Sequence, residues 1–149
     1  MEKERFLILD THFIGEITER EVAIEFLRLG YMVSKPLVQS SRYDFIVDIH
    51  DMLYKIQVKT SQQKDQNWFA FATSTSHTNA KGTTNKIYSE NEVDYFATMF
   101  NHKCYLIPYK LCGHRSQRLR LTSALNNQVK GILFAKDYEL SKTIGRMFD

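Results

Sequence analysis

Four polar side chains are spaced so that one fold can bring them together: Glu19, Asp44, Gln57 and Lys59. The last three lie in a mostly apolar stretch that is interrupted at His50-Asp51, which predicts two strands joined by a two-residue turn. With that turn Ile49 faces Met52, and counting outward places Asp44 opposite Gln57, at roughly 5 Å between Cβ atoms. Lys59 lies two residues further along and points to the same side of the sheet. A carboxylate, an amide and an ammonium are therefore expected to meet there.

That set of groups suits the hydrolysis of a phosphodiester bond. Mg²⁺ prefers oxygen ligands, and these are available from the Asp44 carboxylate, the Gln57 amide and the main-chain carbonyl of Val58. Glu19 adds a second carboxylate through water. The ammonium of Lys59 is suited to orient the attacking water and to stabilise charge at the phosphate. We therefore expect Glu19, Asp44, Gln57 and Lys59 to be catalytic, and Asp44, Gln57, Val58 and Glu19 to hold the metal.

Glu19 reaches this place only from a helix that packs against the strands. The segment Gly15–Leu29 predicts such a helix, which ends at Gly30. Its apolar stripe places Glu19 among Val22, Ala23 and Phe26. An acid on a buried face is costly unless it is compensated. In the ordinary interpretation, Arg20 or a lysine pairs with Glu19, or the end of the helix is partly open to water. In the functional interpretation, which we favour, Glu19 points at the strand face that carries Asp44.

The other polar residues also have ordinary explanations. Asp44 can cap a turn after Ser40-Ser41-Arg42, and Gln57 and Lys59 can be outward residues of an amphipathic strand. For each residue alone that explanation is the more common one. The order of the set favours chemistry: an acid on a helix, an acid on a strand, and then polar-x-Lys on the paired strand.

The remaining pattern predicts one α/β domain over residues 1–149, without a repeat or linker. A polar, exposed loop is expected at Ser76–Tyr88, and a helix around Tyr138–Met147. Further strands are expected at Tyr31–Ser34, Asn67–Thr75, Asp94–Phe100 and Lys103–Tyr109.

The composition is that of an ordinary globular protein, with 43% hydrophobic and 25% charged residues. No apolar run approaches the roughly 20 residues of a membrane span, and only four apolar-rich residues, 6–9, follow the charged N-terminus, which disfavours a signal peptide. Cys104 and Cys112 form no metal-binding pattern and favour a reducing compartment, the cytoplasm. The net charge of +3 permits a nucleic acid partner without requiring one.

The ordered set resembles the PD-(D/E)XK nuclease superfamily. The chain is similar, over nearly its whole length, to the homing endonucleases of cyanobacterial group I introns that have this fold. It also resembles archaeal Holliday-junction resolvases, but only until shortly after Lys59. The segments that carry the resemblance are Gly15–Glu19, Leu29–Val33, Arg42–Asp44, Ile56–Thr60, Val93–Phe96, Tyr105–Pro108 and Ala135–Tyr138.

The resemblance implies a restriction-endonuclease-like α/β core, with a mixed central β-sheet flanked by helices. It implies cleavage of double-stranded DNA with Mg²⁺, or Mn²⁺, at a long pseudo-palindromic target, by a homo-oligomer that is a dimer or a tetramer. The active site it implies is Glu19, Asp44, Gln57 and Lys59. Two departures stand out: Tyr43 replaces the proline of the family name, and Gln57 replaces the usual acid, which removes one negative charge from the metal site.

Basic and polar runs predict where DNA lies. One by one these residues are equally well explained as ordinary surface, but together the runs favour DNA contact. Because one active site cuts one strand, two copies related by a two-fold axis are expected, and residues near the C-terminus are candidates for their contact: Tyr138, Ile144, Met147 and Phe148. The predicted DNA-binding residues are Gln39, Arg42, Lys81, Asn85, Lys86, Arg115, Gln117, Arg118 and Arg120.

Three other functions stay open beside a site-specific DNA endonuclease. They are a Holliday-junction resolvase, a DNA-binding module that does not cleave, and a protein-interaction domain. The 90 residues after Lys59 exceed what a compact resolvase core requires. Glu19, Asp44 and Lys59 disfavour a silent module, whereas Gln57 leaves it open.

Overall fold

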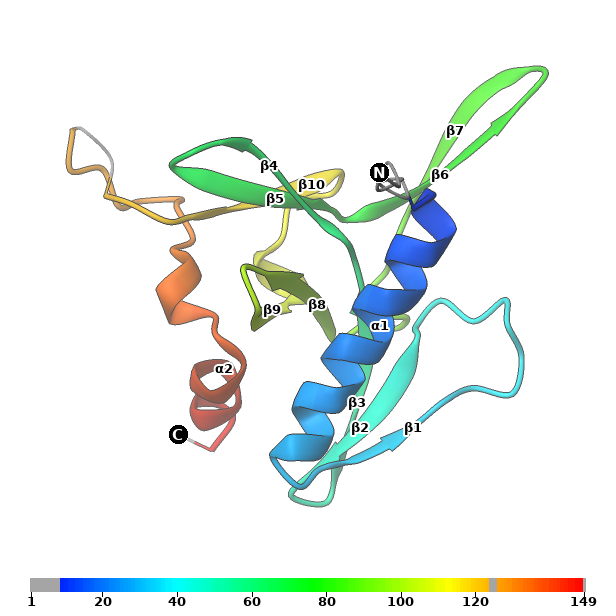
Figure 1. Cartoon of the computed structure of the whole chain (residues 1–149), viewed down its shortest axis with the longest axis horizontal. Coiled ribbons are helices and arrows are strands. Elements are labelled where there is room, and N and C mark those ends of the chain that lie inside the picture. Colours follow the sequence, from blue (N-terminus) through cyan, green and yellow to red (C-terminus); the bar gives the residue numbers. More distant parts are fainter. Residues whose placement is uncertain (1–8, 124–125, 149) are drawn as a thin grey trace, which may run out of the picture.

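The computed structural model describes residues 9–123 and 126–148, and its centre is a five-stranded mixed sheet (Figure 1). The strand order is β1-β2-β3-β8-β9, in which β3 and β8 are parallel and the other neighbours are antiparallel. The strands are β1 (Met32–Ser34), β2 (Phe45–Ile49), β3 (Met52–Val58), β8 (Tyr95–Phe100) and β9 (Lys103–Pro108). Two helices, α1 (Thr11–Arg28) and α2 (Leu140–Arg146), pack against this sheet.

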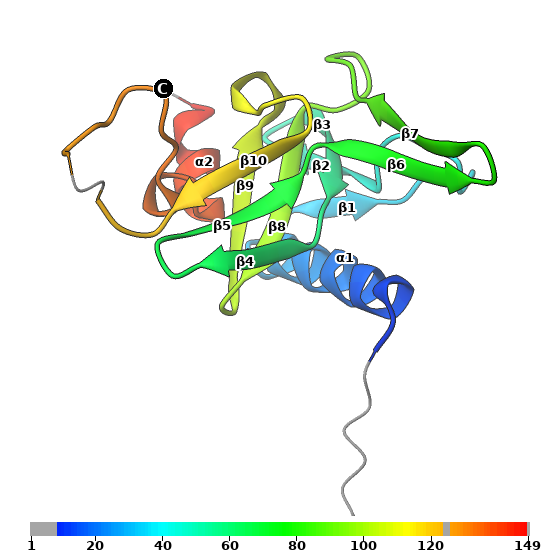
Figure 2. The same ribbon diagram turned by 90° about the horizontal axis from the view of Figure 1, so that it is seen from above.

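Two smaller sheets follow β3 in the chain. One has the order β10-β5-β4 and consists of β4 (Ser61–Asp65), β5 (Trp68–Ala72) and β10 (Ser116–Arg120). Figure 2 shows this sheet lying across the strands of the central sheet. The other is a two-stranded hairpin of β6 (Ser74–Asn79) and β7 (Gly82–Ile87), which projects from the body of the molecule. Short 3-10 turns lie at Tyr109–Leu111 and Ala135–Asp137.

The central sheet is buried on both faces, because its side chains alternate between two cores. In β9, Cys104 and Leu106 face the core shared with α1 and α2, whereas Tyr105 and Ile107 face the core shared with β5 and β10. Both described helices therefore cover one face, and the three-stranded sheet covers the other. Val22 and Phe26 of α1, each fully buried, anchor that helix on the first face.

The β2–β3 hairpin has the predicted register. Ile49 pairs with Met52 and Phe45 pairs with Ile56. His50 and Asp51 form the turn with φ values of 49° and 67°, the left-handed geometry that matches the twist of a two-residue hairpin. The ring of Phe148 lies 4.2 Å from that of His50, so the end of the described chain packs on this turn.

Three expectations differ from the structure. Helix α1 begins at Thr11, four residues before Gly15, because Asp10 caps it by accepting hydrogen bonds from the His12 and Phe13 amides. The segment Ser76–Tyr88 is exposed as expected, but most of it is the β6–β7 hairpin instead of a loop. Ile144 is 5% exposed and packs in the core of its own chain, so it is not a surface for another copy.

The expectation about a signal peptide concerns residues 1–9, most of which lie outside the described residues. Among the helices that are described, none is long and apolar enough to span a membrane.

Candidate active site

Two acids from different elements line one cavity of about 590 Å³, as the sequence predicted for Glu19 and Asp44. Glu19 comes from the middle of α1, and Asp44 directly precedes β2. The Lys35 ammonium lies 2.9 Å from the Glu19 carboxylate, and the Glu19 side chain is only 17% exposed. Both interpretations of Glu19 therefore hold, because it is paired with a lysine and it also faces the cavity that Asp44 lines.

Asp44 is fixed to β3 by two hydrogen bonds. Its amide donates to the Ile56 carbonyl at 2.9 Å, and its carboxylate accepts from the Val58 amide at 2.7 Å. Burial raises the pKa of Asp44 to about 6 and the negative charge of Glu19 adds to the rise, whereas the Val58 amide, Lys59 and Lys35 oppose it. The carboxylate thus lies in a place where an additional positive charge would stabilise its ionised form.

Gln57 and Val58 lie on β3, directly beside Asp44. The Gln57 side chain is half-buried, and its amide group donates a 3.5 Å hydrogen bond to the Val58 carbonyl. The amide nitrogen of Gln57, and not its oxygen, therefore faces the Val58 carbonyl that is also predicted to hold a metal. Neither residue lines the cavity of Glu19 and Asp44, so the predicted ligands are adjacent without all facing the same space.

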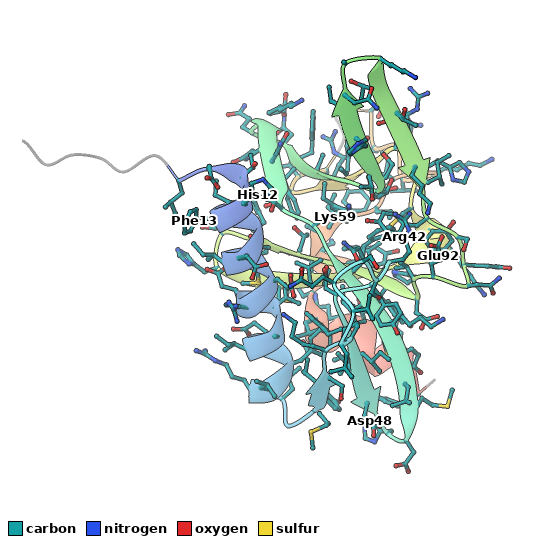
Figure 3. All side chains as sticks on the ribbon, turned by 90° about the vertical axis from the view of Figure 1, so that its right-hand side faces the viewer. His12, Phe13, Arg42, Asp48, Lys59 and Glu92 are labelled. Carbon is teal, nitrogen blue, oxygen red and sulfur yellow. The ribbon has the colours of Figure 1, made fainter. Side chains whose placement is uncertain are left out.

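Lys59 follows β3 and reaches toward the base of the β6–β7 hairpin. Its ammonium donates to the Ser74 carbonyl at 3.4 Å and lies 4.9 Å from the centre of the Tyr88 ring. Its charge is close enough to lower the pKa of Asp44. Figure 3 shows Lys59 near Arg42 and Glu92 on the side of the molecule from which the hairpin projects.

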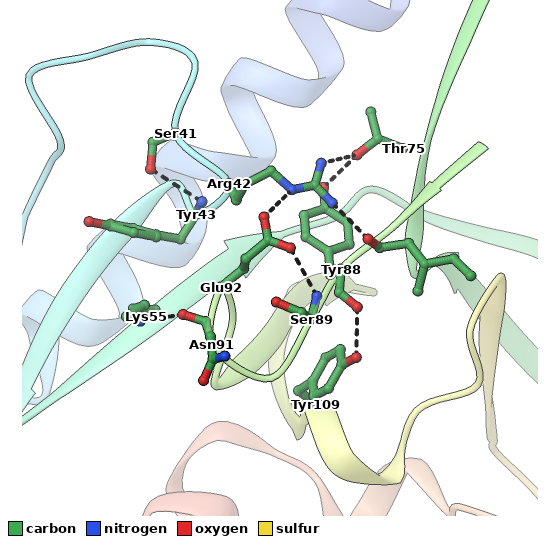
Figure 4. A network of polar contacts seen from close by, with 11 residues as sticks. Ser41, Arg42, Tyr43, Lys55, Thr75, Tyr88, Ser89, Asn91, Glu92 and Tyr109 are labelled. Carbon is green, nitrogen blue, oxygen red and sulfur yellow. Dashed lines mark hydrogen bonds and ion pairs between the residues drawn. The ribbon is translucent and has the colours of Figure 1, made fainter. Parts of the chain in front are cut away.

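Arg42 joins the segment before Asp44 to the base of the hairpin (Figure 4). Its guanidinium donates to Glu92 at 2.8 Å, to the Thr75 hydroxyl at 3.2 Å and to the Ile87 carbonyl at 3.3 Å. It also lies 3.8 Å from the centre of the Tyr88 ring. These bonds use three of the five N–H donors of the guanidinium, and the expected contact of Arg42 with DNA stays a prediction.

Tyr88 and Glu92 complete this network. The Tyr88 hydroxyl accepts from Thr75, and its carbonyl accepts from the Tyr109 hydroxyl. Burial alone would raise the pKa of Glu92, but bonds from Ser89 and the charge of Arg42 outweigh it and lower that pKa. Neither Tyr88 nor Glu92 was predicted from the sequence, because no spacing or period relates them to Asp44 or Lys59.

Three predicted DNA-binding residues lie on the projecting hairpin: Lys81, Asn85 and Lys86. Every residue of β6 and β7 except Ser74 is exposed. The chain contains no acid between Asp65 and Glu90, so the hairpin carries positive charge with no negative charge of its own. Gln39 lies exposed on the connection between β1 and β2, beside the acid-lined cavity.

The other four predicted residues lie at or near β10. The Arg118 guanidinium stacks 4.0 Å from the Trp68 ring, and together they line the outer face of the three-stranded sheet. Gln117 and Arg120 bond to neighbouring backbone groups, and Arg115 is exposed in the turn before the strand. The predicted basic run is therefore separate from the hairpin, on a different sheet.

The donor atoms of this site are of the chemical type that a divalent cation prefers. Within the described parts of the chain, no three His, Cys, Asp or Glu side chains form a metal-binding group. The site instead offers the carboxylates of Glu19 and Asp44, the Gln57 amide and the Val58 carbonyl, which are all hard oxygen donors of the type that Mg²⁺ prefers. Burial is the main cause of the raised pKa of Asp44, so a cation bound beside this carboxylate would favour its ionised form.

Comparison with known proteins relates the chain to a nuclease family and to a solved nuclease structure. The family described as PD-(D/E)XK endonuclease matches residues 9–141. The solved structure of a bacterial homing endonuclease, I-Ssp6803I, matches with a TM-score of 0.71 and 22% sequence identity, over 93% of this chain and 97% of that one. At that identity the second match shows the fold alone. No curated protein matches the chain. The fold and the family resemblance expected from the sequence are confirmed.

Proposed function

Because the chain belongs to the PD-(D/E)XK endonuclease family, we propose that it is a site-specific endonuclease that cuts both strands of DNA with Mg²⁺ as cofactor. Nucleases of this family generally use divalent metal ions. The observation that carries the proposal is the cavity in which an acid from α1 meets an acid at the start of β2. The lysine after β3 supplies positive charge beside this pair, as phosphodiester hydrolysis requires.

In the proposed site, the carboxylates of Asp44 and Glu19, the Gln57 amide and the Val58 carbonyl are the groups that would hold the cation. When bound, Mg²⁺ supplies positive charge to the phosphate oxygens and lowers the pKa of a bound water. Asp44 is pre-positioned for this part by the Val58 amide. Lys59 orients the water and neutralises charge at the phosphate, and its place is restricted by the Ser74 carbonyl and the Tyr88 ring. Mn²⁺ has the same ligand preferences and is the expected substitute.

DNA contact is proposed for the hairpin and for the β10 region. A two-stranded β-ribbon fits the major groove of B-DNA, which is about 12 Å wide, and the β6–β7 hairpin is such a ribbon, polar and exposed on both faces. Lys81, Asn85 and Lys86 are the expected contacts there, and Arg115, Gln117, Arg118 and Arg120 extend the surface.

The proposed target is long and pseudo-palindromic, as the resemblance seen in the sequence implies, and two copies that each cut one strand would read it. Tyr138, Met147 and Phe148 remain the proposed contacts between copies, since Tyr138 and Met147 are half-buried and Phe148 is 51% exposed. Cys104 and Cys112 are free thiols, and burial raises the pKa of each to about 12, so neither is a reactive nucleophile at neutral pH. The cytoplasm is the proposed compartment because the chain has only two cysteines.

The test is a cleavage assay on a supercoiled plasmid library with random inserts and on a cruciform plasmid, each with Mg²⁺ and with EDTA. Linear product that depends on Mg²⁺ and maps to a consensus insert is expected. Cleavage of the cruciform alone would instead identify a structure-specific resolvase. DNA binding without any cleavage in Mg²⁺ or Mn²⁺ would identify a module that does not cleave, and the absence of both would refute the proposal.

A further inference from the structure

Leu37 and Val38 form an apolar tip on the connection between β1 and β2. Leu37 is 101% exposed and Val38 is 65% exposed, so neither side chain contributes to a core. The tip is not remote from the site, because both residues line the cavity that contains Glu19 and Asp44. Packing within the chain does not explain why two adjacent apolar side chains lie exposed beside a cavity lined by two acids.

The connection holds this tip outward. Pro36 precedes it and restricts the backbone, and the Ser41 amide donates to the Val38 carbonyl at 3.4 Å, which closes a turn. The base of the connection is anchored by the Glu92 and Thr75 bonds of Arg42. No acid lies between Lys35 and Tyr43, so the segment presents only neutral and positive groups to a polyanion.

The connection between β1 and β2, which carries the tip, and the β6–β7 hairpin project on the same side of the molecule (Figure 1). Arg42, labelled in Figure 3, lies where their bases meet. Arg42 connects the two bases, and Lys59 lies against Ser74 and Tyr88 at the root of the hairpin. A duplex whose phosphate reaches Asp44 therefore has the hairpin on one side of that backbone and the tip on the other.

The sugar–phosphate backbone separates the major groove from the minor groove. Since the ribbon fits the major groove, an element on the opposite side of the cut backbone meets the minor groove. Apolar side chains that enter a minor groove unstack a base step and kink the duplex. We propose that Leu37 is a wedge that enters the minor groove at the cleavage site, with Val38 packed against the sugars. This inference rests on the proposed DNA-cleaving function.

The wedge has a defined effect on cleavage. Unstacking costs a few kcal/mol per step and permits the DNA to bend toward more of the protein surface. Removal of the wedge lowers the rate of cutting at saturating DNA by at least about tenfold. Initial binding, which depends on phosphate charges, changes much less.

The experiment compares wild type, Leu37→Ala and Leu37→Ser with the control Leu53→Ala. Leu53 is 65% exposed at the turn end of β3, away from the cavity, so it matches Leu37 in size and type. The probe is a duplex recovered from the plasmid library because wild type cuts it, with 2-aminopurine placed in turn at each step around the cut. Fluorescence is read with Ca²⁺ in place of Mg²⁺, and single-turnover cleavage is read with Mg²⁺.

A rise in fluorescence at one step beside the cut is expected for wild type and Leu53→Ala, together with its loss in both Leu37 variants. The same fluorescence and the same cleavage rate for all four proteins would overturn the wedge and leave the nuclease proposal intact. If wild type cuts no DNA in the library, the proposed function itself fails and the wedge with it. A change of oligomeric state without DNA in the Leu37 variants, with unchanged fluorescence, would assign the tip to contact between copies.

Discussion

The hairpins β2–β3 and β6–β7 are both tight and antiparallel, and they differ in almost everything except their backbone. In β2–β3, Phe45, Val47 and Ile49 alternate into the core, and Ile46 and Asp48 between them are half-buried. In β6–β7, every position after Ser74 is exposed, and the strands consist mainly of Ser, Thr, Asn and Lys. The buried hairpin fixes the proposed reacting groups, and the exposed hairpin is available to bind.

The difference lies in where charge is placed. Asp44 on the first hairpin is half-buried and near Glu19, so its ionised form is destabilised until a cation arrives. Lys81 in the turn of the second hairpin and Lys86 on β7 are exposed, and this hairpin carries no acid. Substitutions in the first hairpin should therefore change catalysis and stability, and substitutions in the second should change affinity and its dependence on salt.

The largest expected effect is the loss of catalysis in Lys59→Ala. Removing the ammonium takes away charge stabilisation at the phosphate, so the cleavage rate should fall by about a thousandfold or more. Binding should persist, because it depends mainly on other phosphate contacts. A plasmid cleavage assay beside a gel-shift assay measures both, and complete plasmid cutting by Lys59→Ala would refute the assignment of the active site.

The next effect concerns stability and has a defined dependence on pH. Asp44 has an ordinary pKa of 3.8 when unfolded and about 6 when folded, so the folded state binds more protons between those values. The free energy of unfolding therefore falls as pH rises through this interval and stays lower above it, by at most about 3 kcal/mol. Asp44→Asn keeps an acceptor for the Val58 amide and removes the ionisation, so it should be more stable than wild type above pH 6 and equal to it below pH 4.

Denaturant unfolding across pH, without metal, isolates Asp44 as the difference between wild type and Asp44→Asn. Addition of Mg²⁺ should stabilise wild type above pH 6 and leave the variant unchanged, because the cation binds the folded, ionised site. Parallel curves for the two proteins, with and without Mg²⁺, would contradict the burial of charge at Asp44.

The two hairpins also show what the sequence could predict. The β2–β3 hairpin, its turn and its register were predicted because apolar residues alternate with polar ones on both sides of His50-Asp51. The β6–β7 hairpin was predicted as a loop because neither of its faces is buried, so no apolar alternation marks it. Its threonines have strand propensity, and Gly82 provides the positive φ of 124° after the turn, but these are weak signals.

Contacts between side chains that are far apart in the sequence could not be predicted, for a physical reason. The pairing of Arg42 with Glu92, fifty residues apart, and the position of Tyr88 beside Lys59 depend on how β3, β8 and the hairpin are placed in three dimensions. Lys35 as the partner of Glu19 was predicted only as an unspecified lysine. The periodicity of apolar residues indicates which face of a helix or strand is buried. It does not indicate which polar side chains from different elements contact each other.

Gln57→Glu tests the departure from the family pattern in the first hairpin. The substitution restores a carboxylate beside Asp44, which adds negative charge and should tighten cation binding several-fold. Cleavage should persist with half-maximal activity at a lower Mg²⁺ concentration, measured by metal titration of the cleavage rate. The pKa of Asp44 should rise further in the metal-free variant, since a second like charge is added. Unchanged metal dependence would place Gln57 outside the metal site.

The smallest expected effect belongs to the second hairpin. Lys81→Ala and Lys86→Ala each remove one exposed ammonium and break no bond of the ammonium within the described chain, so thermal stability should not change. If each lysine contacts one phosphate, each substitution should reduce the slope of log K against log salt by about 0.9 and weaken binding a few-fold at moderate salt. Lys103→Ala is the control, because Lys103 is an exposed lysine at the opposite end of the central sheet, paired with Glu139 at 3.4 Å. Equal salt slopes for the hairpin variants, the control and wild type would show that these lysines do not contact the DNA backbone. The proposed DNA-binding role of β6–β7 would then be wrong, whereas the proposed catalytic role of β2–β3 would be unaffected.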